Sequence, residues 1–491
     1  MAAGVVFLAA ASVLVLEILS LRLVAPYLGL TLQTSTAVIG VALSAIATGT
    51  WLGGRAADLV PPRRVLGPLL VLGGGLTTLV VPVVRWAGAS VRGGDVSAVL
   101  LLATLAVFVP AALLSAVTPM VVKLQLAHVA HTGRVVGRLS GVGTLGAIAA
   151  TFGTGFLLVA ALPTSVILLA VGALVAVVGA ALTATLGVRR SGSGPSALAG
   201  PVALLLAGSG ATLLAPDPCR LETAYHCARV LVDPARPGGR TLVLDTLRHS
   251  YVDLADPTYL EFTYLRAVAA AVDAAYDPPR PLRALHLGAG GVTLPRYLAA
   301  TRPGTRSRVL EVDPGVVALD RAELGLRTGA ELQVDIQDAR VGLAQEPEGG
   351  RDLVVGDAFG GLAVPWHLTT RETVADVRRV LAPGGLYAVN VIDFPPLDFA
   401  RAEVATLRAV FAHVAVVATP ETLAGRAGGN LVLLAAATPL PVDRLAALLA
   451  ERVPELRVTA DPAVLDAFVG SARVLTDDFA PVDQLLTPPP G

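Results

Sequence analysis

The sequence RALHLGAGGVTLPRYLAA, residues 283–300, predicts a sharp connection from a buried strand into a helix. Arg283–Leu287 is short and apolar, the glycine turn Gly288-Ala289-Gly290-Gly291 follows, and a helix is expected from about Val292 to Ala300. Glycine accepts positive φ and lets a ligand approach the backbone closely, while the first turn of a helix presents N–H donors. The stretch therefore predicts a turn that holds a nucleoside-type ligand.

The chain beyond this turn alternates short apolar strands with helical segments, which predicts a parallel sheet with crossover helices. Thr369–Leu381 is expected to be a helix, with Pro383-Gly384-Gly385 as its stop signal. The fold class predicted for this half is α/β, a doubly wound Rossmann-like sheet. Its further strands are expected at Arg308–Val312, Leu332–Ile336, Asp352–Val355, Leu386–Val391, Val414–Val417 and Leu431–Leu434.

Three acidic residues follow expected strands. Glu311 ends the second strand about 20 residues after the glycine turn, where a carboxylate can accept both ribose hydroxyls. Asp338 follows the third strand and Asp357 follows the fourth, at the carboxyl edge where such sheets bind ligands. The alternative for Glu311 is a solvated strand end, and the alternative for Asp338 and Asp357 is a helix N-cap.

A different pattern precedes the sheet. Tyr225–Val232, Arg240–Leu244 and Ser250–Leu254 are expected to be short strands joined by turns. The sequence therefore predicts three parts: a helical region over 1–217, a small β-hairpin unit over 218–256 and the Rossmann-like domain over 257–491.

The first part is nearly free of charge, and the whole chain has 15% charged residues against the roughly 25% of an average soluble protein. A membrane-spanning helix needs about 20 mostly apolar residues. The sequence predicts a multi-pass protein of the cell membrane, with the lipid bilayer as a partner, and the small residues of Gly141–Gly155 suit close helix packing. About seven spans are expected, at Val5–Pro26, Ser35–Gly54, Val65–Val84, Ser97–Val117, Leu139–Ala160, Thr164–Gly187 and Ala197–Leu214.

Basic residues are distributed unevenly between the two sides of these spans. Basic loops lie on the cytoplasmic side of membrane proteins, so the N-terminus is expected there. Seven spans would then put the C-terminal half outside, whereas one span fewer would put it inside. The cytoplasmic set is Arg55, Arg63, Arg64, Lys123, Arg134, Arg138, Arg189 and Arg190, and the opposite side has Arg85 and Arg92.

Several residue types limit the chemistry. Cys219 and Cys227 are either two unrelated thiols or a local disulfide, which would require an oxidising compartment. No cluster of zinc-type ligands is present, so no metal is expected. The net charge of +0 gives no electrostatic support for nucleic-acid binding. Glu17 and Arg22, inside the first span, form either a substrate site or a structural pair within the bundle.

The C-terminal half, from about Glu222 onward, resembles the spermidine synthase (polyamine aminopropyltransferase) family, and in particular the bacterial proteins in which such a domain follows a transporter-like membrane region. In the first half, Gly53-Gly54-Arg55 with Asp58 is weakly similar to the basic loop of major facilitator transporters. The resemblance implies a class I methyltransferase-like sheet. Its motifs are Glu222-Thr223-Ala224-Tyr225-His226, Leu242-Val243-Leu244-Asp245, the glycine turn, Glu311-Val312-Asp313-Pro314, Asp338-Ala339-Arg340, Gly356-Asp357-Ala358 and Leu475-Thr476-Asp477-Asp478.

The resemblance implies transfer of an aminopropyl group from decarboxylated S-adenosylmethionine to putrescine or a related small amine. Asp357 matches the first aspartate of the family's Asp-x-x-Asp pair and would be the base, while Tyr225 and His226 would lie at the amine. Gly288, Gly290, Gly291, Glu311 and Asp338 would bind the nucleoside, with Glu311 at the ribose and Asp338 at the adenine amino group. The family's soluble members suggest a homo-oligomer.

The sequence departs from the family at three places. Gly360 stands where the pair has its second aspartate, His226 replaces a glutamine, and Gly290-Gly291 replaces a turn with an internal aspartate. Asp256 or Glu261 is either a replacement charge or an ordinary surface group. Two other functions stay open: a methyltransferase-like enzyme that uses S-adenosylmethionine itself, and a non-catalytic sensor or transporter of polyamines or nucleosides.

Overall fold

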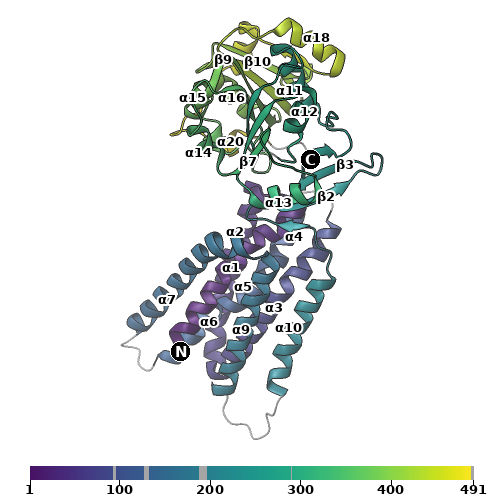
Figure 1. The fold of residues 1–491 in the computed structure, drawn as a ribbon. Helices are drawn as coiled ribbons and strands as arrows, with labels where there is room; N and C mark the ends of the chain where they lie inside the picture. The colour runs from purple at the N-terminus through teal and green to yellow at the C-terminus, as the bar shows by residue number, and fades with distance from the viewer. Residues whose placement is uncertain (92–95, 127–131, 187–195, 289, 488–491) are drawn as a thin grey trace. The chain divides into compact units, whose positions relative to one another are not determined.

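The computed structural model describes the chain except for residues 92–95, 127–131, 187–195, 289 and 488–491 (Figure 1). The described chain divides into two compact units, Met1–Cys227 and Ala228–Gly491. The three-part division expected from the sequence stays a prediction. Arg92, Arg189 and Arg190, which entered the expected distribution of basic loops, lie outside the described residues.

The first unit is helical, and six of its helices are long and apolar enough to cross a membrane. They match six predicted spans, which confirms those spans by length and hydropathy. The fourth contains α4 (Val96–Ala103), a π-helical segment (Thr104–Phe108), α5 (Val109–Ser115) and α6 (Val117–Gln125). The fifth contains α7 (Thr132–Phe152), a π-helical segment (Gly153–Leu158) and α8 (Val159–Ala161). The others are α1 (Ala2–Leu28), α2 (Leu32–Leu59), α3 (Pro62–Ser90) and α9 (Thr164–Leu186).

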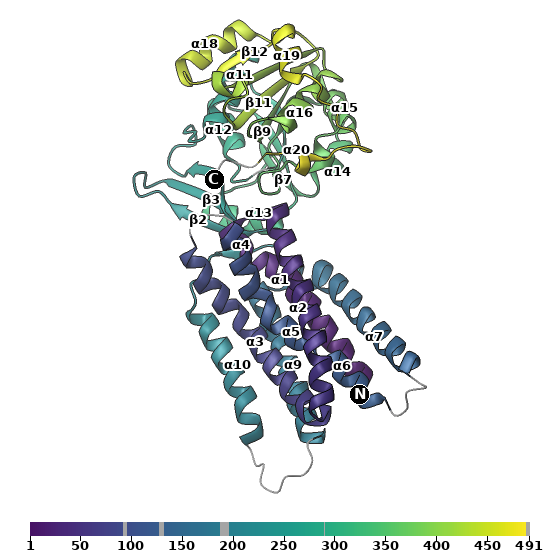
Figure 2. The ribbon, with the colours of Figure 1, turned by 180° about the vertical axis from the view of Figure 1, so that it is seen from behind.

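A further helix, α10 (Ser196–Leu214), coincides with the seventh predicted span and lies beside α3 and α9 (Figures 1 and 2). Leu204 packs at Gly75 of α3, and Gly208 packs at Thr78 one turn further along both helices. Because both contacts advance in the same direction, α10 runs parallel to α3. The short strand β1 (Leu221–Glu222) follows it.

A close helix contact joins α3 and α9 through glycines seven residues apart on each helix. A Cβ atom built on Gly74 would lie 2.4 Å from the Gly172 carbonyl oxygen, and one on Gly67 would lie 2.8 Å from that of Gly179. Small residues at such positions let two helix backbones touch. In α7, where close packing was expected, Gly146 contacts the backbone of Phe7, but a Cβ on Gly141 would meet nothing within 4 Å.

We expect Gly74→Ala to destabilise the helical unit, because a methyl group at this contact forces the two backbones apart at a cost of about 1–3 kcal/mol. Thermal unfolding of the full chain in detergent measures the effect as a lower Tm. Gly141→Ala is the matched control and should leave Tm unchanged. An equal Tm for both variants would contradict the contact.

A small four-stranded sheet of order β1-β2-β3-β4 contains β1 and then β2 (Cys227–Val232), β3 (Gly239–Leu244) and β4 (Leu247–Asp253), of which the last three pair antiparallel. These strands match the three predicted ones. The helix α11 (Thr263–Ala275) follows and leads to the larger sheet.

The larger sheet has the order β12-β10-β11-β9-β8-β5-β6-β7. The five strands from β9 to β7 are parallel, whereas β11, β10 and β12 pair antiparallel, so the expected parallel sheet is a mixed one. The difference arises because β10 and β11 are separated by only residues 419–428, which contain the four-residue α17 and are too few for a crossover helix. The strands are β5 (Arg283–Leu287), β6 (Arg306–Glu311), β7 (Leu332–Ile336), β8 (Arg351–Gly356), β9 (Leu381–Asp393), β10 (His413–Ala418), β11 (Gly429–Ala436) and β12 (Arg457–Thr459).

Helices cover both faces of this sheet. Along β8, the side chain of Val354 belongs to one core, which contains residues of α15 and α16, and Val355 belongs to the other, which contains residues of α11. This alternation follows the two-residue period of a strand. The connecting helices are α12 (Thr293–Thr301), α13 (Pro314–Glu323), α14 (Ala339–Ala344), α15 (Arg371–Val380), α16 (Asp398–Arg408), α17 (Pro420–Leu423), α18 (Val442–Arg452), α19 (Pro462–Val469) and α20 (Val482–Leu485).

The order of the strands reverses at β5. The chain proceeds from β5 to β6 and β7 in one direction, and later adds β8 and β9 on the other side of β5. Ligands of open α/β sheets bind outside the carboxyl ends of the strands at such a reversal. The ends of β5 and β8, at Leu287 and Gly356, therefore define where a site is expected.

Candidate active site

Asp357 follows β8 directly and is anchored at the strand reversal. Its backbone N–H donates to the Leu287 carbonyl oxygen over 2.9 Å. One carboxylate oxygen accepts the hydroxyl of Tyr264 at 2.8 Å, and the other accepts the side-chain amide of Asn390 at 2.9 Å. Tyr264 belongs to α11 and Asn390 to β9. Asp357 is therefore not the helix N-cap that was its alternative, and its carboxylate is held from two sides.

The amide that reaches Asp357 is itself oriented by a neighbour. The side-chain oxygen of Asn390 accepts the amide N–H of Asn430, on β11, at 2.9 Å. Asn390 is 3% exposed. Because its oxygen is occupied by Asn430, its amino group points to Asp357.

Burial raises the pKa of the Asp357 carboxyl above its ordinary value, and the hydrogen bonds from Asn390 and Tyr264 lower it by less. The pKa of the Tyr264 hydroxyl lies well above its ordinary range, because of burial and the Asp357 charge. Nearby on β5, burial lowers the pKa of His286 to about 3, so its ring is neutral at pH 7. A small pocket lined by Tyr264, His286, Gly288 and Asp357 joins these groups.

The glycine turn has the backbone that only glycine adopts readily. Gly288 has φ of +87° and Gly290 has φ of +47°. A Cβ atom on Gly288 would lie 2.6 Å from the Asp357 carbonyl oxygen, so the turn and the β8 end pack without side chains between them. Ser250, on β4, accepts the N–H of Gly291 at 2.8 Å, which ties the small sheet to the turn. Ala289 lies outside the described residues.

Glu311 is the last residue of β6, next to the glycine turn at the end of β5. One of its carboxylate oxygens accepts the backbone N–H of Asp313 at 2.9 Å, and Asp313 in turn caps α13. The carboxylate is thus fixed at the strand end that the sequence predicted. Its contact with a ribose stays a prediction.

Asp338 is the N-cap of α14, as its alternative interpretation stated. One carboxylate oxygen accepts the backbone N–H groups of Arg340 and Val341, and the other lies 3.0 Å from the His367 ring. The N-cap position does not remove it from the sheet edge, since it follows β7. Its contact with an adenine amino group stays a prediction.

The remaining predicted residues lie elsewhere. Tyr225 and His226 lie in the turn between β1 and β2, in the first unit, and their role at the amine stays a prediction. Asp256 accepts the hydroxyl of Thr258 at 2.6 Å, and Glu261 accepts that of Tyr259 at 2.6 Å. Both carboxylates have local surface partners.

With this geometry in place, the chain can be compared with known proteins. The polyamine aminopropyltransferase of Vibrio vulnificus is 29% identical over 235 residues, which are 46% of this chain and 75% of the relative. Polyamine aminopropyltransferase 2 of Streptomyces coelicolor is 36% identical over 138 residues, which are 26% of this chain and 24% of that relative. No family model matches the sequence.

The C-terminal half of the chain is spermidine synthase-like. A solved structure titled a probable spermidine synthase, from Corynebacterium glutamicum, aligns with 29% sequence identity and a TM-score of 0.49, covering 52% of this chain and 95% of its own. The curated relatives named polyamine aminopropyltransferase align with this half, which confirms the predicted resemblance there, and their names support a transferase.

The edge of the spermidine synthase-like sheet fits an S-adenosyl compound. Two positive-φ glycines form a sharp turn at the carboxyl end of β5, where ligands of such sheets bind, and a fixed carboxylate stands at the end of β6. Among the described residues, no group of three or more His, Cys, Asp or Glu side chains is placed to hold a metal ion.

Sequence reasoning missed Tyr264, Asn390 and Asn430, which hold the Asp357 carboxylate. A signal was present for the last two, because they are the two asparagines of the chain and both stand in apolar strand sequences. A buried amide needs a partner. Tyr264 carried no such signal, since aromatic residues are common on the buried face of a helix.

We expect Tyr264→Phe to raise the pKa of Asp357 further, because the variant loses a hydrogen bond that stabilises the charged carboxylate. Infrared titration of the full chain would show the protonated carboxyl band of Asp357 persisting to higher pH. Asp357→Asn assigns the band by abolishing it, and Tyr297→Phe is a control on α12. An unchanged titration in Tyr264→Phe would contradict the bond.

Proposed function

We propose that this chain is a membrane-bound aminopropyltransferase that moves the aminopropyl group of decarboxylated S-adenosylmethionine to a small primary amine, of which putrescine is the first candidate. The observation that carries the proposal is the Asp357 carboxylate, fixed by Tyr264 and Asn390 at the strand reversal beside the glycine turn. The names of the relatives support the same reaction.

The reaction needs a base, because a protonated amine has no lone pair with which to attack. Asp357 accepts the proton from the amine, whose nitrogen bonds to the propyl carbon while the carbon–sulfur bond breaks and the neutral thioether leaves. The raised pKa of Asp357 strengthens it as a base. The two neutral donors on the carboxylate keep it oriented toward the amine.

The loop after β8 offers the acceptor one carboxylate fewer than the aspartate pair of the family. Gly360 forms a tight bridge with Ala363, its N–H donating to the Ala363 carbonyl oxygen at 2.8 Å. No side chain projects from the position where the second aspartate of the pair would stand. One ammonium group can therefore be bound by Asp357, and the far end of the amine needs another partner.

Purified full-length protein should release 5′-methylthioadenosine from decarboxylated S-adenosylmethionine in the presence of putrescine. Replacement of a general base typically costs about 10²–10⁴-fold in rate, and Asp357→Asn should lose at least as much. Asp443→Asn, an exposed aspartate on α18, is the matched control and should retain full activity. A folded Asp357→Asn variant with normal turnover would refute the proposal.

A methyltransferase-like enzyme is the second candidate, favoured by the glycine turn, which has Gly290-Gly291 where the family has an internal aspartate. Calorimetry of the full chain separates the two candidates. Tighter binding of decarboxylated S-adenosylmethionine supports aminopropyl transfer. Tighter binding of S-adenosylmethionine itself, whose carboxylate needs a cationic or N–H partner, supports the alternative.

A further inference from the structure

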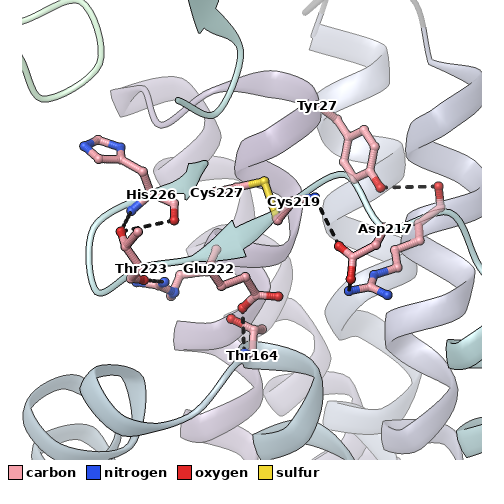
Figure 3. The surroundings of a disulfide bond; sticks show 10 residues. Tyr27, Thr164, Asp217, Cys219, Glu222, Thr223, His226 and Cys227 are labelled. Atoms are coloured by element: carbon pink, nitrogen blue, oxygen red, sulfur yellow. Dashed lines mark hydrogen bonds and ion pairs between the residues drawn. A yellow bond between two sulfur atoms is a disulfide. The ribbon is translucent and has the colours of Figure 1, made fainter. Parts of the chain in front are cut away.

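The segment that follows α10 is attached to one end of the helical unit (Figure 3). Asp217 forms an ion pair of 2.8 Å with Arg85, near the last residues of α3, and the Arg85 side chain is 5% exposed. The carboxylate of Glu222 accepts the backbone N–H of Thr164, the first residue of α9, at 2.7 Å. Arg22, near the end of α1, donates to backbone carbonyl oxygens of this same segment.

These contacts decide how many times the chain crosses the helical unit. α9 has 23 residues and is about 34 Å long, so Leu186 lies at the opposite end from Thr164. Glu222 is back at Thr164, and α10 therefore runs the whole way between the two ends. The contacts of α10 along α3 agree with this direction. The first residue of α1 and the segment 217–227 thus lie at opposite ends of the unit.

Most of the described arginine and lysine residues of the helical unit lie at the end where α1 begins. The end that carries 217–227 has fewer described basic residues: Arg85, which pairs with Asp217, Arg22, which is bound to backbone carbonyl groups, and Arg220. Short loops rich in arginine and lysine stay in the cytoplasm. The described basic residues at the end where α1 begins are Arg55, Arg63, Arg64, Lys123, Arg134 and Arg138.

A second, independent observation concerns the two cysteines of the chain. Cys219 and Cys227 form a disulfide within the attached segment. Of the two alternatives left open by the sequence, the bridge is the one present. Structural disulfides persist in oxidising compartments and are rare in the cytoplasm. The bridge closes the loop that carries Tyr225 and His226, the residues predicted at the amine (Figure 3).

We infer that the α/β unit lies on the outer side of the cytoplasmic membrane. Charge distribution and the disulfide are independent, and both assign the 217–227 end to that side. The chain enters the second unit at Ala228 with no further crossing, because the longest helix among that unit's described residues, α11, has 13 residues and is too short to span a bilayer.

The consequence for substrate, which rests on the proposed function, is that the amine acceptor is one found outside the cytoplasm. The nucleoside donor is a cation with a sulfonium centre and must reach the same side. An export or release step for the sulfonium nucleoside must therefore precede the aminopropyl transfer. The location is tested without any assay of transfer, so the two ideas can fail separately.

The test is thiol accessibility in intact cells that express the full chain. A membrane-impermeant maleimide should leave the wild-type protein unlabelled, and should label both cysteines after a membrane-impermeant phosphine reduces the bridge. Maleimide labelling of the unreduced protein would contradict the disulfide. So would cysteines that stay unlabelled after the membranes are isolated, the phosphine is added and the protein is unfolded with a denaturant.

Reporter cysteines in a Cys219→Ser, Cys227→Ser background locate each side. Two exposed positions should be labelled in intact cells. They are Leu30→Cys, just after the last residue of α1, and Ser471→Cys, on the second unit. Val60→Cys, between α2 and α3, is the matched control and should be labelled only after permeabilisation. The opposite pattern would overturn the proposal.

If the serine background does not fold, a fusion to the C-terminus of the wild-type chain gives the same answer. Alkaline phosphatase, which needs its own disulfides, should be active there, and a fluorescent protein that matures only in the cytoplasm should be dark. An inactive phosphatase with a bright fluorescent fusion would place the α/β unit inside and refute the inference.

Discussion

The carboxylate of Asp357 is largely buried and accepts hydrogen bonds from two neutral donors that belong to different layers of the α/β unit. Burial alone would favour its protonated form, and the hydroxyl of Tyr264 and the amide of Asn390 oppose that effect. A base for an amine needs this balance, because a carboxylate with a very low pKa accepts a proton weakly. The position of α11, the register of β9 on β8 and the contact of β11 with β9 must all be correct for this balance to exist.

The glycine turn depends on the same packing. Gly288 lies so close to the backbone of Asp357 that a side chain on it would separate β5 from the loop after β8. Ser250 braces the far end of the turn from the small sheet. The small sheet therefore supports the glycine turn of the candidate site.

Helix packing in the first unit has a different basis, because apolar side chains give little specificity to helices that are surrounded by lipid. One of its close contacts is made by backbone atoms of α3 and α9 that meet across glycines. At the end of the unit, charged groups are satisfied within the segment that follows α10. The pair of Arg85 and Asp217 and the bond of Glu222 to Thr164 fix the exit of the chain. Arg22, which the sequence analysis considered together with Glu17, donates hydrogen bonds to backbone carbonyl groups of the segment where the chain leaves this unit.

The sequence by itself determined the elements: the apolar spans, the glycine turn, the acidic residue at each strand end and the resemblance that they carry. These follow from local periodicity and from the backbone freedom of glycine, which need no tertiary information. Contacts between distant residues determine which acidic residue is held by two neutral donors and which is a helix cap, because Tyr264 and Asn390 are distant from Asp357 in sequence. They also fix where the segment after α10 is attached, through Asp217 and Glu222, whereas the Cys219–Cys227 bridge depends on the local conformation of an eight-residue loop that the sequence left open.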